Sequence, residues 1–273
     1  MSTTTLTAII TIMKELKKVL LLNKKVSETP LECVKRFKET NPEYKDLKLG
    51  YAGRLDPMAK GLLLVLVGYE NKKKIEYEGL TKEYTFEVIF GTATDSYDIL
   101  GLPEKSLLTN LGEDFDDKLI EVFESYKGEI VQKLPIYSAG RVNGKPLFKL
   151  AKDGLIKEEG SPTRNVTIYN IELLGKRECP ISDLLTDIER RILGVNGNFR
   201  QKEIIEAWKS VIKTKSREQN SKILVYKIKV KCSHGTYIRS LTHEIGNKLK
   251  TKATVFEIER TRIGDFSLIP TGV

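Results

Sequence analysis

The sequence GYAGRLDPMAKGLLLVLVG occupies residues 50–68 and joins an aspartate to an uninterrupted apolar run. Asp56 precedes Pro57, which fixes its own φ, lacks a backbone N–H and disfavours the helical region for the residue before it. Glycines on both sides allow a tight turn and a close approach to a ligand. The run at 61–68 predicts either a strand buried on both faces or a buried helix. We therefore expect a carboxylate held rigidly at the mouth of a cleft, although Asp-Pro alone also fits an ordinary turn.

The composition limits the class of protein. The chain has 273 residues, of which 40% are hydrophobic, enough for one large core or two modest ones. Its 46 Lys and Arg exceed its 37 Asp and Glu, which gives a net charge of +9. This excess is compatible with a nucleic acid partner, and a well-solvated surface would explain it equally.

The cysteines and the N-terminal residues indicate whether the protein binds a metal and in which cellular compartment it lies. Cys33, Cys179 and Cys232 are scattered, without metal-ligand or disulfide spacing, and only His234 and His243 could assist them. We therefore expect no metal site, and a reducing, cytoplasmic setting. No apolar run reaches the roughly 20 residues that span a bilayer. The apolar N-terminal stretch lacks a preceding basic region, so neither a membrane association nor a signal peptide is expected.

Apolar periodicity predicts an α+β fold with a mixed, mainly antiparallel central sheet flanked by helices. Strands are expected at 19–25, 84–91, 166–175 and 223–232. A capping box at Thr29 and Glu32 predicts the start of one helix, and a second is expected from Thr236. Residues 180–222 are polar and charge-rich but carry helical spacing around Trp208, so we expect a helical insertion, with a mobile solvated loop as the alternative.

Three further side chains could bind or react. Arg239 lies in the first turn of the expected second helix, where exposed N–H groups and the helix dipole favour an anion. Its guanidinium could grip a carboxylate or phosphate with two donors, or form an ordinary structural salt bridge. Tyr84 alone is most simply a half-buried core tyrosine. His234 and His243 are expected to be surface groups.

In this order, the segments resemble the TruB-type tRNA pseudouridine synthase family. GYAGRLDPMAKGLLLVLVG is similar to the family's catalytic motif, with Asp56 at the aspartate position. KEYTFEVIFGTATDSYDILG is similar to its tyrosine motif, with Tyr84 in place, and CSHGTYIRSLTHEIG to its arginine motif, with Arg239 in register. Residues 253–268 resemble the C-terminal core segment and place Ile258 at an apolar base contact.

The resemblance covers most of residues 19–268 and includes LPIYSAGRVNGKPLFKLAKDG. LLLNKKVSETPLECVKRF matches the first family motif in part, because the family commonly has Lys-Pro-x-Gly where this chain begins at Lys24 with Lys-Lys-Val-Ser. Family members often have His-Thr where this chain has Tyr51 and Ala52.

The resemblance implies the pseudouridine synthase fold and the isomerisation of the T-arm uridine of tRNA, at position 55, to pseudouridine. This reaction breaks the N1–C1′ bond and rejoins the uracil through C5, with no cofactor. Asp56 is implied as the catalytic carboxylate, acting either by covalent attack or in proton transfer on the ribose. Arg239 would orient it, and Tyr84 would stack on the uracil. The substrate-binding side chains expected are Tyr84, Arg239, Ile258, Lys24 and Tyr237.

The expected partner is the T arm of tRNA, bound by a monomer through basic side chains, for which the candidates are Lys24, Arg54, Lys60 and Arg141. We expect an N-terminal extension at 1–18 and a catalytic domain at 19–273, with the charged helical insertion at about 180–222. No appended C-terminal RNA-binding domain is expected, so we predict that the insertion supplies part of the tRNA-binding surface.

Two other functions fit the sequence. The protein could be a tRNA-binding folding factor of the same fold whose catalysis is dispensable. It could also be a carboxylate hydrolase unrelated to RNA, which would need a second acid near Asp56, and no spacing in the sequence indicates one.

Overall fold

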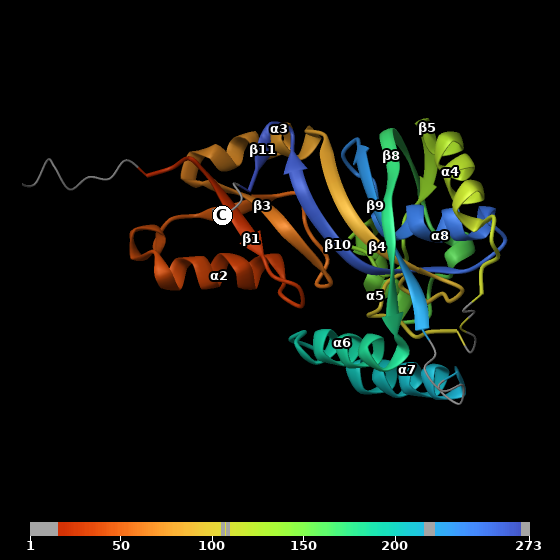
Figure 1. Cartoon of the computed structure of the whole chain (residues 1–273). Coiled ribbons are helices and arrows are strands. Elements are labelled where there is room, and N and C mark those ends of the chain that lie inside the picture. Colours follow the sequence, from red (N-terminus) through yellow and green to blue (C-terminus); the bar gives the residue numbers. More distant parts are fainter. Residues whose placement is uncertain (1–15, 105–106, 108–109, 216–221, 269–273) are drawn as a thin grey trace, which may run out of the picture.

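A nine-stranded sheet forms the centre of the protein (Figure 1). The computed structural model describes residues 16–104, 107, 110–215 and 222–268. The strands follow the order β1-β3-β10-β4-β9-β8-β5, with β2 paired to β3 and β11 paired to β10. The pairs are antiparallel except for β3 with β10, which is parallel, within the described part of the chain. The strands of this sheet are β1 Val19–Lys24, β2 Leu49–Ala52, β3 Ala59–Val67, β4 Lys82–Phe90, β5 Gly128–Lys133, β8 Thr163–Pro180, β9 Lys222–Cys232, β10 Ala253–Ile263 and β11 Phe266–Ser267.

Helices surround this sheet, and a two-stranded ribbon lies apart from it. The helices are α2 Pro30–Thr40, α3 Lys74–Gly79, α4 Phe115–Tyr126, α5 Leu147–Lys152, α6 Ile181–Leu193, α7 Gln201–Lys215 and α8 Ile238–Lys248, and the ribbon consists of β6 Arg141–Val142 and β7 Lys145–Pro146. Figure 1 shows α6 and α7 together beyond one end of the sheet, while α4 and α8 lie beside β8 and β9. The expected α+β class, the mainly antiparallel sheet and the helical insertion are confirmed. No helix of the described residues is long and apolar enough to cross a membrane.

Local sequence explains how several elements begin. The Thr29 hydroxyl accepts from the backbone N–H of Glu32, and the Glu32 carboxylate accepts from the backbone N–H of Thr29, so the predicted capping box starts α2. The apolar run after Gly61 is a strand: β3 pairs with β1, β2 and β10 and is buried on both faces, which explains why it does not alternate. Helix α8 starts two residues later than expected, because Tyr237 is extended and serves as its N-cap.

Two apolar clusters lie on opposite faces of the sheet, as two adjacent residues of β4 show, because successive side chains of a strand point to opposite faces. Phe90 belongs to the cluster that includes α4 and α8, and Ile89 belongs to the cluster that includes α6 and α7. Trp208 of α7 is fully buried in the second cluster and donates from its indole N–H to the carbonyl of Ile99. The insertion is therefore part of the folded core.

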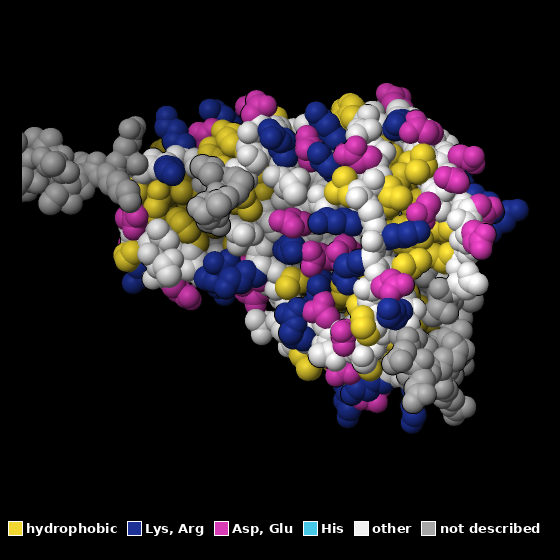
Figure 2. Space-filling view, viewed as in Figure 1, with side chains coloured by type: hydrophobic (Ala, Val, Ile, Leu, Met, Phe, Trp, Pro, Cys, Tyr) yellow, Lys and Arg dark blue, Asp and Glu magenta, His cyan; other side chains and the backbone are white. Residues whose placement is uncertain are grey.

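The sheet face on which α6 and α7 pack is charged outside the apolar cluster. Figure 2 shows Lys and Arg interleaved with Asp and Glu over the sheet. Lys60 lies 2.6 Å from Glu257, and Arg177 lies 2.8 Å from Glu87. Since these cations are paired with carboxylates, this face does not concentrate the basic excess of the chain.

We predict that Gly61→Ala destabilises the protein by about 3 kcal/mol or more, because two penalties add. Gly61 has φ +99°, and a Cβ there would lie 2.4 Å from the backbone oxygen of Arg260 on β10. Gly68→Ala is the control, since φ is +58° and the Cβ would meet no atom within 4 Å. That variant should lose about 1 kcal/mol, from backbone strain alone. Equal losses in urea denaturation would contradict the steric argument.

Candidate active site

The loop that carries Asp56 joins β2 to β3 and is anchored on both sides. Leu55 is buried in the cluster with α4 and α8, and Met58 is buried in the cluster with α6 and α7. The Asp56 side chain between them is 37% exposed. Gly53 begins the loop at φ +78°, a conformation that favours glycine. Because its flanking residues insert into opposite cores, the carboxylate has little freedom to move along the loop.

Lys24 supports this loop from beneath. Its side chain is fully buried, and its ammonium donates to the carbonyls of Lys25, Pro57 and Ala59. Burial lowers the pKa of Lys24 to about 8, against the opposing charges of Glu28 and Asp56. Three carbonyls use the three ammonium donors. Lys24 therefore supports the Asp56 loop from within the protein, and its expected contact with substrate stays a prediction.

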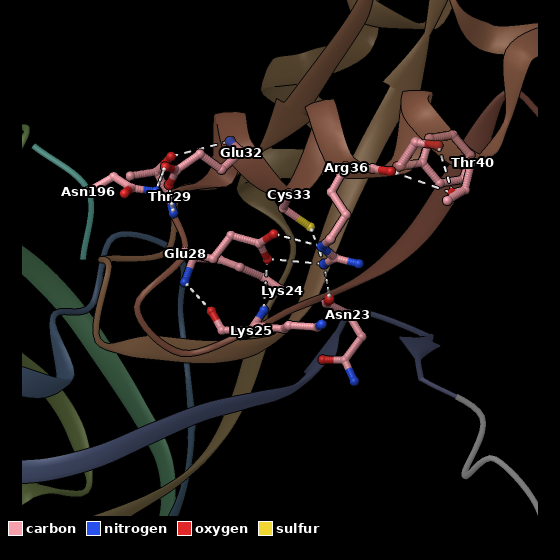
Figure 3. Close-up of polar contacts among 11 residues, drawn as sticks. Asn23, Lys24, Lys25, Glu28, Thr29, Glu32, Cys33, Arg36, Thr40 and Asn196 are labelled. Carbon is pink, nitrogen blue, oxygen red and sulfur yellow. Dashed lines mark hydrogen bonds and ion pairs between the residues drawn. The ribbon is translucent and has the colours of Figure 1, made fainter. Parts of the chain in front are cut away.

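The ends of the Lys24 segment are fixed as well. Figure 3 shows Lys24 beside Glu28, whose carboxylate accepts two bonds from the guanidinium of Arg36. Asn196 from the insertion donates to Glu32 at the start of α2, 2.7 Å away. The backbone N–H of Ser27 donates to the carbonyl of Pro57. The residue after Asp56 is thus held by two donors from one segment.

Arg239, on the first turn of α8, binds Asp56 from the other side. Its Nε and Nη2 lie 2.9 and 2.8 Å from Oδ2 of Asp56. Nη1 donates to the carbonyl of Ser96 at 2.7 Å, and Nη2 to that of Tyr137 at 3.1 Å. Although burial opposes the charge, the carboxylates of Asp56 and Asp98 raise the pKa of Arg239 above its usual value. The two side chains that the sequence expects together are in direct contact, and Oδ1 of Asp56 has no hydrogen-bond partner among the described residues.

A cavity of about 670 Å³ opens onto this pair, which is large enough for a nucleoside. Tyr84 on β4 and Ile258 on β10 lie on neighbouring strands and form its apolar wall. Both are nearly buried, at 8% and 6% exposure. Burial raises the pKa of Tyr84, and nearby Arg260 acts in the opposite direction. Five of the six expected site residues line this cavity, the exception being Lys24.

Tyr237 is placed by a residue that the sequence did not reveal. Gln132 on β5 is 1% exposed, and its amide exchanges two hydrogen bonds with the backbone of Tyr237, at 2.8 and 3.1 Å. These two hydrogen bonds fix the residue before α8 and hence the direction from which Arg239 enters the site. The partners are 105 residues apart, so no local pattern indicates the contact.

A second carboxylate, Asp98, also lies close to Arg239 and was not expected. It is 5% exposed, and Oδ2 lies 3.7 Å from Nε of Arg239. Oδ1 accepts from the hydroxyl of Ser96 and the N–H of Leu100. Burial raises the pKa of Asp98, with the charge of Arg239 opposing. Asp98 is buried, faces Arg239 and does not line the large cavity, which fits support of Arg239 better than contact with a substrate.

Besides Arg239, three arginines border the cavity, of which the sequence suggested only Arg54. Arg260 is 1% exposed and donates to the carbonyls of Gly53 and Leu62. Arg54, which was suggested, and Arg164, which was not, are exposed at the mouth and form no ion pair with a described carboxylate. Gly235, at φ +81°, leaves the room in which the Arg164 guanidinium lies.

The remaining suggested residues lie elsewhere. Lys60 pairs with carboxylates on the opposite face of the sheet, and exposed Arg141 donates to the carbonyl of Gly144 in its own ribbon. His234 is exposed at the cavity mouth, whereas His243 stacks on Tyr97 with ring centroids 4.1 Å apart. Within the described residues, no group of three or more His, Cys, Asp or Glu is arranged to hold a metal ion.

Residues 38–191 match the family described as TruB family pseudouridylate synthase (N terminal domain). The chain belongs to this family. The matched residues include the Asp56 loop and β4, and the Arg239 helix lies beyond them.

Relatives in the TruB family are similar over most of the chain. The chain is 33% identical over 222 residues to tRNA pseudouridine synthase B of Clostridium tetani, which covers 81% of this chain and 60% of that relative. It is 32% identical over 249 residues to the Aquifex aeolicus protein of the same name, covering 91% and 69%. The Endomicrobium trichonymphae protein of that name is 33% identical over 253 residues, covering 92% and 86%. The match thus spans only three fifths of the first relative's own length.

Solved structures confirm the fold. The chain resembles one in the crystal structure of a Cbf5-Nop10-Gar1 complex with a TM-score of 0.55 at 22% identity, covering 93% of this chain and 51% of that one. A chain of an H/ACA RNP bound to a substrate RNA containing 2′-deoxyuridine gives 0.52 at 22% identity, covering 93% and 50%. Together with the family match, this likeness confirms the pseudouridine synthase fold.

We predict that Lys24→Met changes how stability depends on pH. The folded-state pKa of Lys24 is about 8, against 10.5 ordinarily, so between these values the unfolded chain holds a proton that the folded chain lacks. Stability of the native protein therefore rises with pH in this window, and below pH 8 both states are protonated. The free energy of unfolding of the native protein minus that of Lys24→Met should grow by about 2 kcal/mol from pH 7 to 10.

The control is Lys25→Met, whose side chain is exposed beside Lys24. It should leave the difference from the native protein constant over the same pH range. Denaturant titrations at each pH give both quantities. A pH-independent difference for Lys24→Met would contradict the lowered pKa.

Proposed function

We propose that this protein is a tRNA pseudouridine synthase that isomerises the T-arm uridine at position 55, with Asp56 as its catalytic carboxylate. One observation carries the proposal. Asp56 has Oδ2 held by buried Arg239 and Oδ1 without a hydrogen-bond partner in the part of the chain that the structure describes, at a cavity walled by Tyr84 and Ile258. The membership of the TruB family and the names of the relatives support the reaction.

The reaction is an isomerisation that this set of side chains suits. The N1–C1′ bond of uridine breaks and a C5–C1′ bond forms, while C5 loses a proton and N1 gains one. Asp56 offers an oxygen toward the ribose, either for covalent attack or for proton transfer. Tyr84 provides a ring on which the freed uracil can stack while it turns, and Ile258 excludes water from that space.

The target uridine has to leave its base stack to reach Asp56, at a cost of a few kcal/mol. Contacts between phosphates and cations can offset this cost. Arg54 and Arg164 stand at the cavity mouth without ion-pair partners among the described residues, in contrast to the paired lysines on the opposite face. They are the natural contacts for the RNA backbone on either side of the flipped nucleotide.

Both alternative functions are weaker. A folding factor does not need an arginine that is 3% exposed to hold a carboxylate beside an open cavity. A hydrolase needs a second acid in the cavity, and Asp98 is buried with Oδ1 bonded to Ser96 and Leu100.

Asp56→Asn tests the catalytic role. Asn keeps an oxygen that can accept from Arg239 but removes the charge, so we expect the rate of pseudouridine formation to fall by about 10³-fold while tRNA affinity is kept. Asp117→Asn, an exposed acid on α4, should change neither quantity. The measurements are chemical mapping of modified uridines in tRNA and binding by filter retention.

The outcome also separates the alternatives. Unchanged function of Asp56→Asn would favour the folding factor, and activity without any need for tRNA would favour the hydrolase. Modification at a uridine outside the T arm would contradict the substrate assignment and leave the reaction intact.

The double variant Arg54→Ala, Arg164→Ala tests the RNA-binding mouth. We expect tRNA affinity to fall about tenfold and the slope of log affinity against log salt to lose about two units, since two phosphate contacts disappear. The control removes two positive charges from the opposite face, with Arg177→Ala and Lys229→Ala, whose partners are Glu87 and Glu172. Equal effects of the two double variants would show that only net charge matters.

A further inference from the structure

The loop between α6 and α7 reaches back toward the active site through Arg200. Its Nη1 lies 2.8 Å from Oδ2 of Asp95, and its guanidinium carbon lies 4.7 Å from the centre of the Tyr137 ring. The residue has φ +62°, a left-handed conformation that non-glycine residues rarely adopt. The unusual backbone conformation therefore occurs at Arg200, the residue whose side chain contacts Asp95 and Tyr137.

The two segments that Arg200 joins are the ones that hold Arg239. The carbonyl of Ser96, the residue after Asp95, accepts from Nη1 of Arg239 at 2.7 Å. The carbonyl of Tyr137 accepts from Nη2 of Arg239 at 3.1 Å. These carbonyls belong to segments about 40 residues apart in sequence, and Arg200 contacts a side chain in each.

We propose that Arg200 is a positioning residue for the Asp56–Arg239 pair, because it clamps together the two segments whose carbonyls orient the guanidinium of Arg239. The inference rests on the proposed function of that pair. It assigns the helical insertion a part in catalysis that is separate from its predicted share in the tRNA-binding surface.

The clamp is fixed at each end. Oδ1 of Asp95 accepts from the backbone N–H of Leu102 at 2.8 Å, so the carboxylate that meets Arg200 is itself oriented. The planar guanidinium pairs with Asp95 and at the same time lies over the Tyr137 ring, a combination that an ammonium cannot reproduce.

The insertion has other anchors, so removing the clamp need not release it. Trp208 is buried and donates to the carbonyl of Ile99. Arg191 donates to the carbonyl of Phe256 and pairs with Glu257 at 3.0 Å. A variant at Arg200 therefore tests the link to the active site while these anchors keep the two helices in place.

A direct contact with RNA is the competing role for Arg200. A second cavity, of about 260 Å³, lies against Asp56 on the insertion side, and Arg200 lines it together with Arg54 and Phe199. A phosphate contact there would change tRNA affinity, whereas a clamp changes the rate of the bound complex. The two roles therefore predict effects on different measured quantities.

The first experiment compares Arg200→Met with Arg190→Met. Arg190 is an exposed arginine of the same insertion whose ion pair is with Asp187 in its own helix. Under single-turnover conditions with saturating enzyme, Arg200→Met should form pseudouridine about tenfold more slowly, with the Kd for tRNA within twofold of the native value. Arg190→Met should match the native protein in both. An unchanged rate overturns the proposal, and so does a weaker Kd with an unchanged saturated rate, which would assign Arg200 to RNA binding.

The second experiment keeps the proposal testable if Arg200→Met folds poorly, as judged by circular dichroism. Arg200→Lys keeps the charge opposite Asp95 and loses the stacked plane, so its rate should lie between those of the native protein and Asp95→Asn. Adding Arg200→Lys to Asp95→Asn should then slow the reaction no further, because Asp95→Asn already disconnects one of the two segments that the clamp joins. If the rate reductions of the two single variants multiply in the double variant, the clamp is overturned.

Failure of this inference can be told from failure of the proposed function. If the native protein forms no pseudouridine in tRNA, the proposed function fails. If the native protein is active and the Arg200 variants match it, only the clamp fails.

Discussion

The ion pair between Asp56 and Arg239 is the contact on which the rest of the site depends. Moving a guanidinium out of water is costly unless its donors are satisfied and its charge is countered. Arg239 is 3% exposed, and it meets that condition with the carboxylates of Asp56 and Asp98 and the carbonyls of Ser96 and Tyr137. Three separate segments of the chain must therefore meet at one side chain, since Ser96 and Asp98 belong to the same segment, and each is fixed by a further contact of its own.

The sheet makes that meeting possible. Neighbouring strands β4 and β10 present Tyr84 and Ile258 to one cavity, while the loop before β3 brings Asp56 over it. Leu55 and Met58 tie this loop to opposite apolar clusters, and buried Lys24 binds its carbonyls. A carboxylate held in this way does not need to be reoriented when substrate arrives, which is what preorganisation requires.

Sequence patterns predicted the parts of the site that short motifs encode. Asp56, Tyr84 and Arg239 each lie in a segment that resembles a family motif, and the structure brings them to one cavity. Lys24 is expected at the substrate because its segment resembles a family motif in part, and only the fold shows that its ammonium donates to backbone carbonyls. Gln132 and Asp98 were missed for the same reason: their roles come from contacts with residues more than 100 positions away. The apolar run at 61–68 fits a buried strand or a buried helix by sequence alone, and its pairing with three strands decides for the strand.

In the helical insertion, the local sequence pattern hides how much the segment contributes to the core. Its charge-rich sequence suggests an appendage, yet its helices share one apolar cluster with Ile89, Phe256 and Met58. Met58 lies two residues after Asp56, so the core that the insertion completes also anchors the loop that carries Asp56. If the two helices were absent, apolar side chains of β4 and β10 would be exposed to water together with that anchor. The insertion is therefore coupled to the position of Asp56 through burial of apolar surface, whether or not its outer surface also contacts RNA.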